Sequence, residues 1–146
     1  MSETKTFEQI LEEDGVLVYT CKGYSMYPLL RQNKDLLVIR KPEGEIRKYD
    51  IVLFRQNGKY ILHRIIEMNE DTVVTAGDHN TFKDQRIRKD EIIGVLTAIV
   101  RDGKEIDIND PKLKIYGHAA ADLFGPKAFA LKAKAKAGSA VRKLKG

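Results

Sequence analysis

The chain has 146 residues, of which 42% are hydrophobic and 32% are charged, and this length and composition predict one globular domain with its own core. A multidomain enzyme and a disordered tail protein are excluded. The longest apolar stretch, residues 92–100, falls short of the roughly 18 residues that a membrane-spanning helix needs. The acidic N-terminus does not resemble a secretory signal peptide, and the single cysteine, Cys21, cannot form an internal disulfide. We therefore expect a cytoplasmic protein.

The formal net charge of +5 is distributed unevenly along the chain. Residues 111–146 contain nine Lys or Arg and one acidic residue, whereas residues 1–110 contain 17 basic and 20 acidic residues. We predict a domain at residues 1–110 that carries the chemistry and a basic appendage at residues 111–146.

The first predicted element is a short amphipathic helix at residues 4–13, where apolar residues recur at helical spacing. After it, short β-branched runs alternate with turn residues, and Asn57-Gly58 between two such runs is a strong hairpin signal. This pattern predicts a mainly β fold with an antiparallel, barrel-like or sandwich core. The expected strands are residues 15–20, 35–40, 50–55, 60–67, 72–75 and 92–100, with a further short strand at 105–108.

The Ala- and Lys-rich segment after Pro111 favours helices, with breaks at Gly125-Pro126 and at Gly138. The preferred interpretation is that its lysines serve solubility, either on a helix that packs on the β core or on a loosely ordered one. The alternative is weak contact with an anionic membrane surface through its basic and apolar residues. Few aromatic residues stand among the lysines, so specific nucleic-acid binding is not expected.

One candidate for chemistry is Ser25, which follows a predicted strand and stands between the flexible Gly23 and the rigid Pro28. A hydroxyl there can be presented from a fixed backbone. However, glycine, serine and proline are also ordinary turn residues, so this segment alone does not decide between the two interpretations.

A second candidate is His63, in the middle of the predicted strand 60–67. Alternate residues of a strand share a face, so His63 is expected beside Ile61 and Ile65. It is either a core histidine satisfied by a hydrogen bond or a general base, since imidazole titrates near neutral pH.

The polar turn at residues 76–84 contains Asp78, His79 and Asp84. The two carboxylates either cap turn backbone or, beside a histidine, orient its ring and stabilise its protonated form. A zinc site is the minor alternative because the ligand set is poor. We expect neither a metal nor a cofactor.

Five motifs follow one another along the chain: Ser25-Met26-x-Pro28, Tyr49-Asp50-Ile51-Val52, His63-Arg64-Ile65-Ile66, Gly77-Asp78-x-Asn80 with Asp84, and Ile92-Ile93-Gly94-Val95. Their order resembles that of the signal peptidase I and LexA-like superfamily of serine peptidases. The resemblance spans residues 15–100, about two thirds of the chain. The histidine at residue 63 is similar to the general base of the endoplasmic-reticulum and archaeal type of signal peptidase, although we expect no hydrophobic anchor of the kind that signal peptidases have.

The resemblance implies a serine endopeptidase that cleaves a peptide or protein precursor. Ser25 matches the nucleophile, His63 the general base and Asp84 the carboxylate that orients the histidine. The substrate is expected to bind as an extended strand at the edge of the sheet near Ser25, with small side chains near the cut.

Three further residues are expected to support the site. Asp78 matches a second acidic position of the family, and Met26 follows the nucleophile in its motif. Gly23 stands where bacterial signal peptidases often have a serine that helps to bind the oxyanion, so that hydroxyl is absent here. The alternative function is a catalytically inactive peptide-binding module of the same fold.

Overall fold

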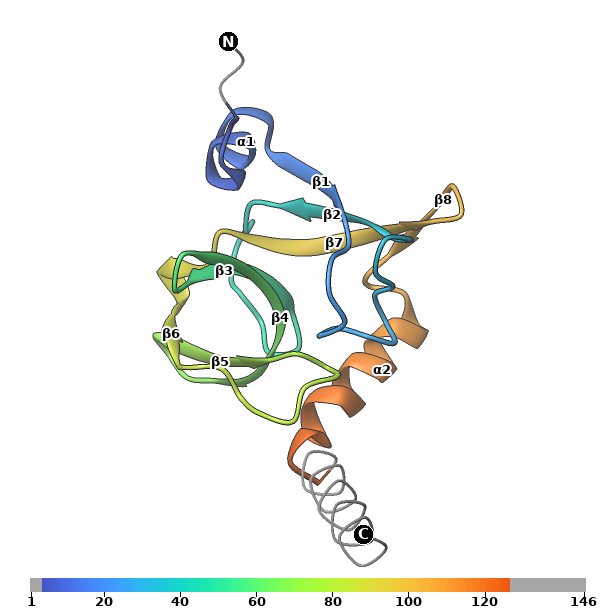
Figure 1. Cartoon of the computed structure of the whole chain (residues 1–146). Coiled ribbons are helices and arrows are strands. Elements are labelled where there is room, and N and C mark those ends of the chain that lie inside the picture. Colours follow the sequence, from blue (N-terminus) through green and yellow to red (C-terminus); the bar gives the residue numbers. More distant parts are fainter. Residues whose placement is uncertain (1–3, 127–146) are drawn as a thin grey trace, which may run out of the picture.

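The computed structural model describes residues 4–126 and confirms the mainly β prediction (Figure 1). Eight strands form one antiparallel sheet in the order β1-β2-β7-β3-β4-β5-β6, with β8 paired to β7. The elements are α1 (Phe7–Asp14), β1 (Val16–Thr20), β2 (Leu36–Arg40), β3 (Ile51–Gln56), β4 (Lys59–Met68), β5 (Thr72–Ala76), β6 (Ile87–Arg88), a 3-10 turn (Lys89–Glu91), β7 (Gly94–Arg101), β8 (Lys104–Asp107) and α2 (Pro111–Asp122).

Helix α1 confirms the predicted N-terminal helix, but it begins at Phe7 and not at residue 4, because Thr6 starts it with a capping box. The Thr6 hydroxyl accepts a hydrogen bond from the Gln9 N–H at 3.1 Å, and the Gln9 side chain accepts one from the Thr6 N–H at 2.8 Å. These contacts satisfy two backbone donors that the first turn leaves unpaired. Leu11 is buried and fixes the helix against the sheet.

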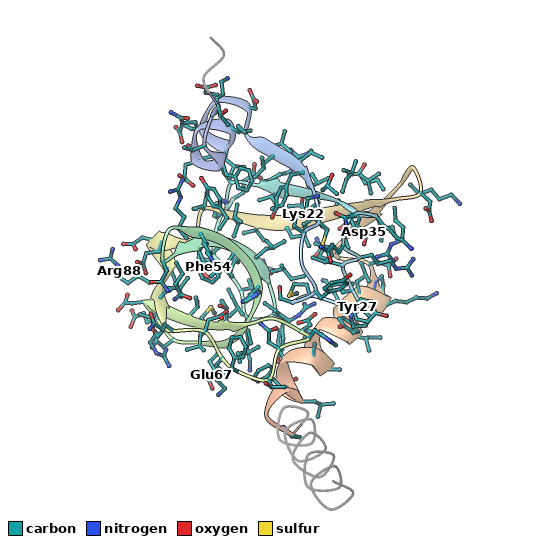
Figure 2. All side chains as sticks on the ribbon, viewed as in Figure 1. Lys22, Tyr27, Asp35, Phe54, Glu67 and Arg88 are labelled. Carbon is teal, nitrogen blue, oxygen red and sulfur yellow. The ribbon has the colours of Figure 1, made fainter. Side chains whose placement is uncertain are left out.

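The sheet curves so that β3, β4, β5 and β6 form a roll, with β1, β2 and β7 beside it (Figure 1). Phe54 lies inside the roll, whereas Glu67 and Arg88 lie on its outside (Figure 2). Short pairing between β3 and β7, at Val52–Val95 and Leu53–Gly94, joins the two parts. The core has two main apolar clusters, one inside the roll around Phe54 and one between β1, β2, β7 and α1 around Leu11. Strand β4 contributes side chains to both: Ile65 to the first and Leu62 to the second.

The predicted strands differ from the observed ones by at most one residue at either end, except at the start of β7. The apolar run at 92–100 is a strand only from Gly94, because the Ile92 N–H closes the preceding 3-10 turn by donating to the Lys89 carbonyl at 3.2 Å. The two-residue strand β6 was not predicted. A strand this short pairs through its backbone and leaves no alternating pattern in the sequence.

Helix α2 begins at Pro111 with Asp110 as its N-cap and packs against β4, burying Gly117 and Ala121. The rest of the predicted basic appendage, residues 127–146, lies outside the described residues, including the expected break at Gly138. Within residues 4–126, neither helix has the length and apolar character that crossing a membrane requires.

Candidate active site

Ser25 lies in the loop that connects β1 to β2, residues 21–35. The Ser25 residue is half-buried, while Met26, Leu29 and Leu30 directly after it are buried in the core. The alternation of buried apolar and exposed residues ties this loop to the sheet along its length. The serine therefore lies in a segment that its buried neighbours anchor to the core.

A buried ion pair fixes the far end of the same loop. Both oxygens of Asp35 accept hydrogen bonds from Arg101 of β7, at 2.9 and 2.7 Å, and Arg101 also donates to the Leu29 carbonyl at 2.7 Å. Burial opposes ionisation of Asp35, but the hydrogen bonds from Arg101 and from the Arg31 N–H outweigh it and hold the pKa of Asp35 below its ordinary value. The charged pair therefore stabilises the loop fold.

His63 of β4 lies beside Asp84, as the resemblance implied. The Nδ1 of His63 is 2.5 Å from Oδ2 of Asp84, and the buried Thr75 hydroxyl donates to the same oxygen at 2.7 Å. The side chains of His63 and Asp84 are only 10% and 6% exposed. A carboxylate can only accept, so Nδ1 carries the proton and Nε2 is left with its lone pair. This tautomer suits a general base.

The turn that follows β5 is packed directly on Ser25. The His79 N–H donates to the Ser25 carbonyl at 2.8 Å, and the Asp78 N–H donates to the Met26 sulfur at 3.4 Å. A Cβ at Gly77 would lie 2.6 Å from the Ser25 carbonyl oxygen and 2.9 Å from its Cβ. Only glycine allows this approach.

Arg64, next to His63, faces the other way and forms a buried ion pair with Asp78. Two guanidinium nitrogens donate to the two Asp78 oxygens, each at 2.9 Å, and a third donates to the Tyr49 carbonyl at 3.0 Å. Helix α2 covers this pair, because Tyr116 lies under the guanidinium and a Cβ at Gly117 would collide with it. Burial, with the nearby Asp78 carboxylate, raises the pKa of Tyr116 to about 12.

Ser25 and His63 line one cavity of about 450 Å³. Among the described residues, no hydrogen bond joins their side chains, and the Ser25 N–H donates to no backbone carbonyl. Catalytic hydrogen bonds are often long before substrate binds. Gly23, on the rim of this cavity, has a positive φ of 80° and offers no hydroxyl.

Comparison with protein families matches residues 2–97 to the family described as Peptidase S24-like. The chain belongs to the Peptidase S24-like family. It is therefore a serine peptidase-type hydrolase at the level of the family. No match was found among curated proteins or among solved structures.

The structure of this Peptidase S24-like chain brings four of the predicted site residues close together: Ser25, Met26, His63 and Asp84. Ser25, His63 and Met26 border one cavity, and Asp84 contacts His63 from behind. Asp78 contacts Arg64, and its backbone contacts Met26. In residues 4–126, no group of three His, Cys, Asp or Glu side chains is arranged to hold a metal ion, and the His79 ring packs edge-on against Tyr27.

The sequence did not predict several contributing residues, because their partners are distant in the chain. Thr75 ends up beside Asp84 through the turn after β5, and Asp35 meets Arg101 across the sheet. The role of Arg64 was the easiest of these to predict, since Arg64 directly follows His63 in its motif.

Proposed function

We propose that this Peptidase S24-like chain is a serine endopeptidase in which Ser25 is the nucleophile, His63 the general base and Asp84 the group that orients His63. The observation that carries the proposal is the His63–Asp84 contact, at 2.5 Å, on the wall of the cavity that Ser25 also lines. Among the described residues that line the cavity, Ser25 is the only serine or threonine and His63 the only histidine, which is the pair that nucleophilic catalysis by a hydroxyl uses.

The chemistry follows from these positions. Nε2 of His63 takes the Ser25 hydroxyl proton as Oγ attacks the peptide carbonyl, and the carbonyl electron pair moves to the oxyanion. The Ser25 N–H supplies one donor for that charge. His63 then gives the proton to the leaving amine, and water repeats the sequence to release the acyl group and restore Ser25. Asp84 stabilises the imidazolium in both halves.

The sheet offers an edge for an extended substrate. Residues 59–63 of β4 pair with β3 on one side, and the pairing of β4 with β5 starts only at Arg64. Residues 60–63 of this half-strand line the cavity that Ser25 also lines. A peptide that adds to this edge brings a carbonyl to Ser25 by β-augmentation, which supports an extended peptide or protein segment as the partner.

The histidine at the base position supports placing the chain close to the endoplasmic-reticulum and archaeal type of signal peptidase. The single free cysteine, Cys21, is buried and agrees with action in a reducing compartment such as the cytoplasm. Weak contact of the basic residues 127–146 with a membrane surface stays a prediction.

The test is hydrolysis of a library of unstructured dodecapeptides, followed by mass spectrometry. The wild-type chain is expected to produce new termini at defined positions, and Ser25→Ala to produce none. Identical peptide profiles from both proteins would reject the peptidase function. An unchanged midpoint of thermal unfolding for Ser25→Ala shows that the loss is chemical.

The second candidate is a module that binds a peptide without cutting it. Two observations favour it: Gly23 supplies no second oxyanion donor, and Ser25 and His63 are not hydrogen-bonded in the described structure. Under this function, Ser25→Ala binds the same peptides as the wild-type chain and neither protein cuts them.

The contact between Gly77 and Ser25 gives a second prediction. Gly77→Ala places a methyl group 2.6 Å from the Ser25 carbonyl oxygen, so the loop must move. A misplacement of about 1 Å costs about 100-fold in rate, and we expect that loss in kcat/KM. Gly125→Ala is the matched control, since its Cβ meets nothing within 4 Å. Equal peptidase rates for the two variants would show that the contact does not position Ser25.

A further inference from the structure

The cavity beside Ser25 and His63 is lined mainly by apolar side chains. Its volume of about 450 Å³ is in the range of ligand sites, which is about 300–1,000 Å³. An alanine side chain would leave most of it unfilled and lose the corresponding dispersion contacts. The apolar lining residues are Phe7, Tyr19, Met26, Leu30, Leu37, Tyr60, Ile61 and Leu62.

The cavity follows β4 away from the reacting atoms. Its lining includes each residue of β4 from His63 back to Tyr60. Three residues of a strand span about 10 Å, so the Tyr60 end is about three substrate residues from the bond at Ser25. A peptide paired with this edge therefore passes its nearest side chains over the apolar lining.

Phe7 of α1 closes the Tyr60 end. Its ring stacks on Tyr60 of β4, with centroids 4.3 Å apart, and on Tyr19 of β1, with centroids 5.0 Å apart. These two strands flank the cavity, so the Phe7 ring bridges them. The Phe7 N–H also donates to the Tyr60 hydroxyl at 3.2 Å.

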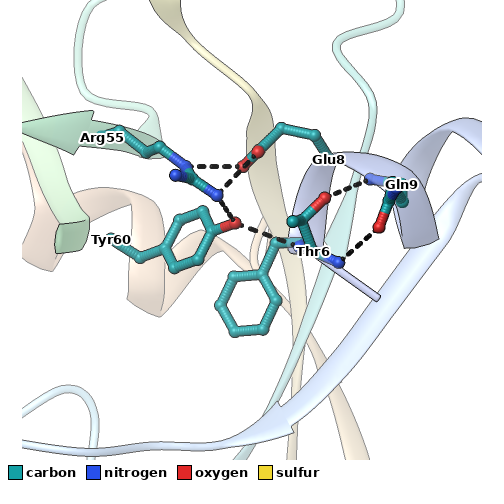
Figure 3. A network of polar contacts seen from close by, with 6 residues as sticks. Thr6, Glu8, Gln9, Arg55 and Tyr60 are labelled. Atoms are coloured by element: carbon teal, nitrogen blue, oxygen red, sulfur yellow. Dashed lines mark hydrogen bonds and ion pairs between the residues drawn. The ribbon is translucent and has the colours of Figure 1, made fainter. Parts of the chain in front are cut away.

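A polar network holds this wall in place (Figure 3). Arg55 of β3 donates to Glu8 of α1 at 3.1 Å and also to the Tyr60 hydroxyl, which links the helix to the β3–β4 hairpin. The capping box fixes the first turn of α1, and buried Leu11 anchors its second. Phe7 is accordingly a fixed wall and not a mobile lid.

The lining includes one lysine, the exposed Lys22, whose ammonium group donates to the Asn33 side chain at 3.0 Å. Two other titratable groups of the lining, Tyr19 and Cys21, are kept neutral mainly by burial. Burial, with a smaller effect of Cys21, raises the pKa of Tyr19 to about 12. Burial, followed by the Asp35 carboxylate, raises the pKa of the Cys21 thiol. Both groups stay neutral at pH 7, and an apolar ligand side chain suits them better than a charged one.

From these contacts we infer that the cavity binds a bulky apolar side chain, of the size of Leu or Phe, within three residues of the scissile bond, and that Phe7 sets the size limit. This inference rests on the proposed peptidase function and departs from the small side chains that the family resemblance implies. The occupant is one side chain of an extended peptide whose carbonyl lies at Ser25.

The test measures binding apart from cutting. Fluorescent decapeptides rich in Thr and Lys carry one variable residue, Ala, Leu, Phe or Trp, and are titrated into Ser25→Ala. We expect Leu or Phe to bind at least about tenfold more tightly than Ala, because one methylene changes selectivity by about 10- to 200-fold. Phe7→Ala in the same background is expected to shift the preference at least about fivefold from Leu toward Trp.

Two further variants test whether a change in binding comes from unfolding of Phe7→Ala and not from the lost wall. Phe7→Leu keeps an apolar wall and should keep the preference for Leu over Trp, and Ile115→Ala, on the exposed face of α2, should change nothing. Equal binding of the Ala and Leu peptides, no binding of any peptide, or an unchanged order in Phe7→Ala would overturn the inference. A Leu preference in a protein whose wild-type form cuts no peptide would support the cavity assignment and reject the peptidase function.

Discussion

His63→Ala is expected to lower kcat for peptide hydrolysis by about 10⁴-fold or more, because it removes the base whose ring Asp84 holds. Lys22, the one lysine among the described residues that line the cavity, donates to the Asn33 side chain at 3.0 Å and is not held toward Ser25. KM should change little, since the loss falls on the transition state. The measurement is a progress curve on a peptide that the wild-type chain cuts, at saturating concentration.

Asp84→Asn tests the same mechanism while it keeps the His63 ring and a side chain of the same size at residue 84. An amide at residue 84 can donate to Nδ1, which favours the wrong tautomer of His63, and a loss of about 10⁴-fold in kcat is expected. The matched control is Asp90→Asn, an exposed residue paired with Arg88. Full activity of Asp84→Asn would contradict the role of Asp84.

Arg64→Met is expected to lower the free energy of unfolding by about 3–5 kcal/mol, because it leaves the buried Asp78 carboxylate without its ionic partner. The side chains of Arg64 and Asp78 are 4% and 2% exposed, so solvent does not replace the lost contact. Urea unfolding at pH 7, with the slope compared between variants, measures the change.

Two companions separate this effect from a general loss of packing. Arg64→Met with Asp78→Leu removes both charges and should recover part of the stability. Lys83→Met breaks an exposed pair with Glu67, worth at most about 1 kcal/mol. If Arg64→Met is no less stable than Lys83→Met, the buried pair does not hold α2 and the turn at residues 77–84 to the sheet.

The fold class was predictable because its signals are local. Alternation of apolar residues and the Asn57-Gly58 turn each act within a few residues, and the strands that they predict are present. The order of strands was not predictable. The placement of β7 between β2 and β3 depends on pairing across more than 40 residues, which no local pattern encodes.

The candidate residues of the site could be predicted from the order of the motifs along the chain. Of the three residues that the motif order selected, Ser25 and His63 line one cavity, and Asp84 contacts His63 without lining the cavity. The aromatic wall was not predictable, because Phe7 has the spacing of an ordinary core residue of an amphipathic helix. Its contact with Tyr60 joins positions 53 residues apart.

The proposal that Ser25 is the nucleophile is tested most directly by covalent labelling of its hydroxyl. A fluorophosphonate reagent forms a bond from phosphorus to an activated serine oxygen and releases fluoride, so it reports the nucleophile without a known substrate. We expect one adduct, mapped by tryptic mass spectrometry to Ser25, with labelling lost in His63→Ala. An unlabelled Ser25 in a folded protein that still cuts peptides, or equal labelling in His63→Ala, would contradict the proposal.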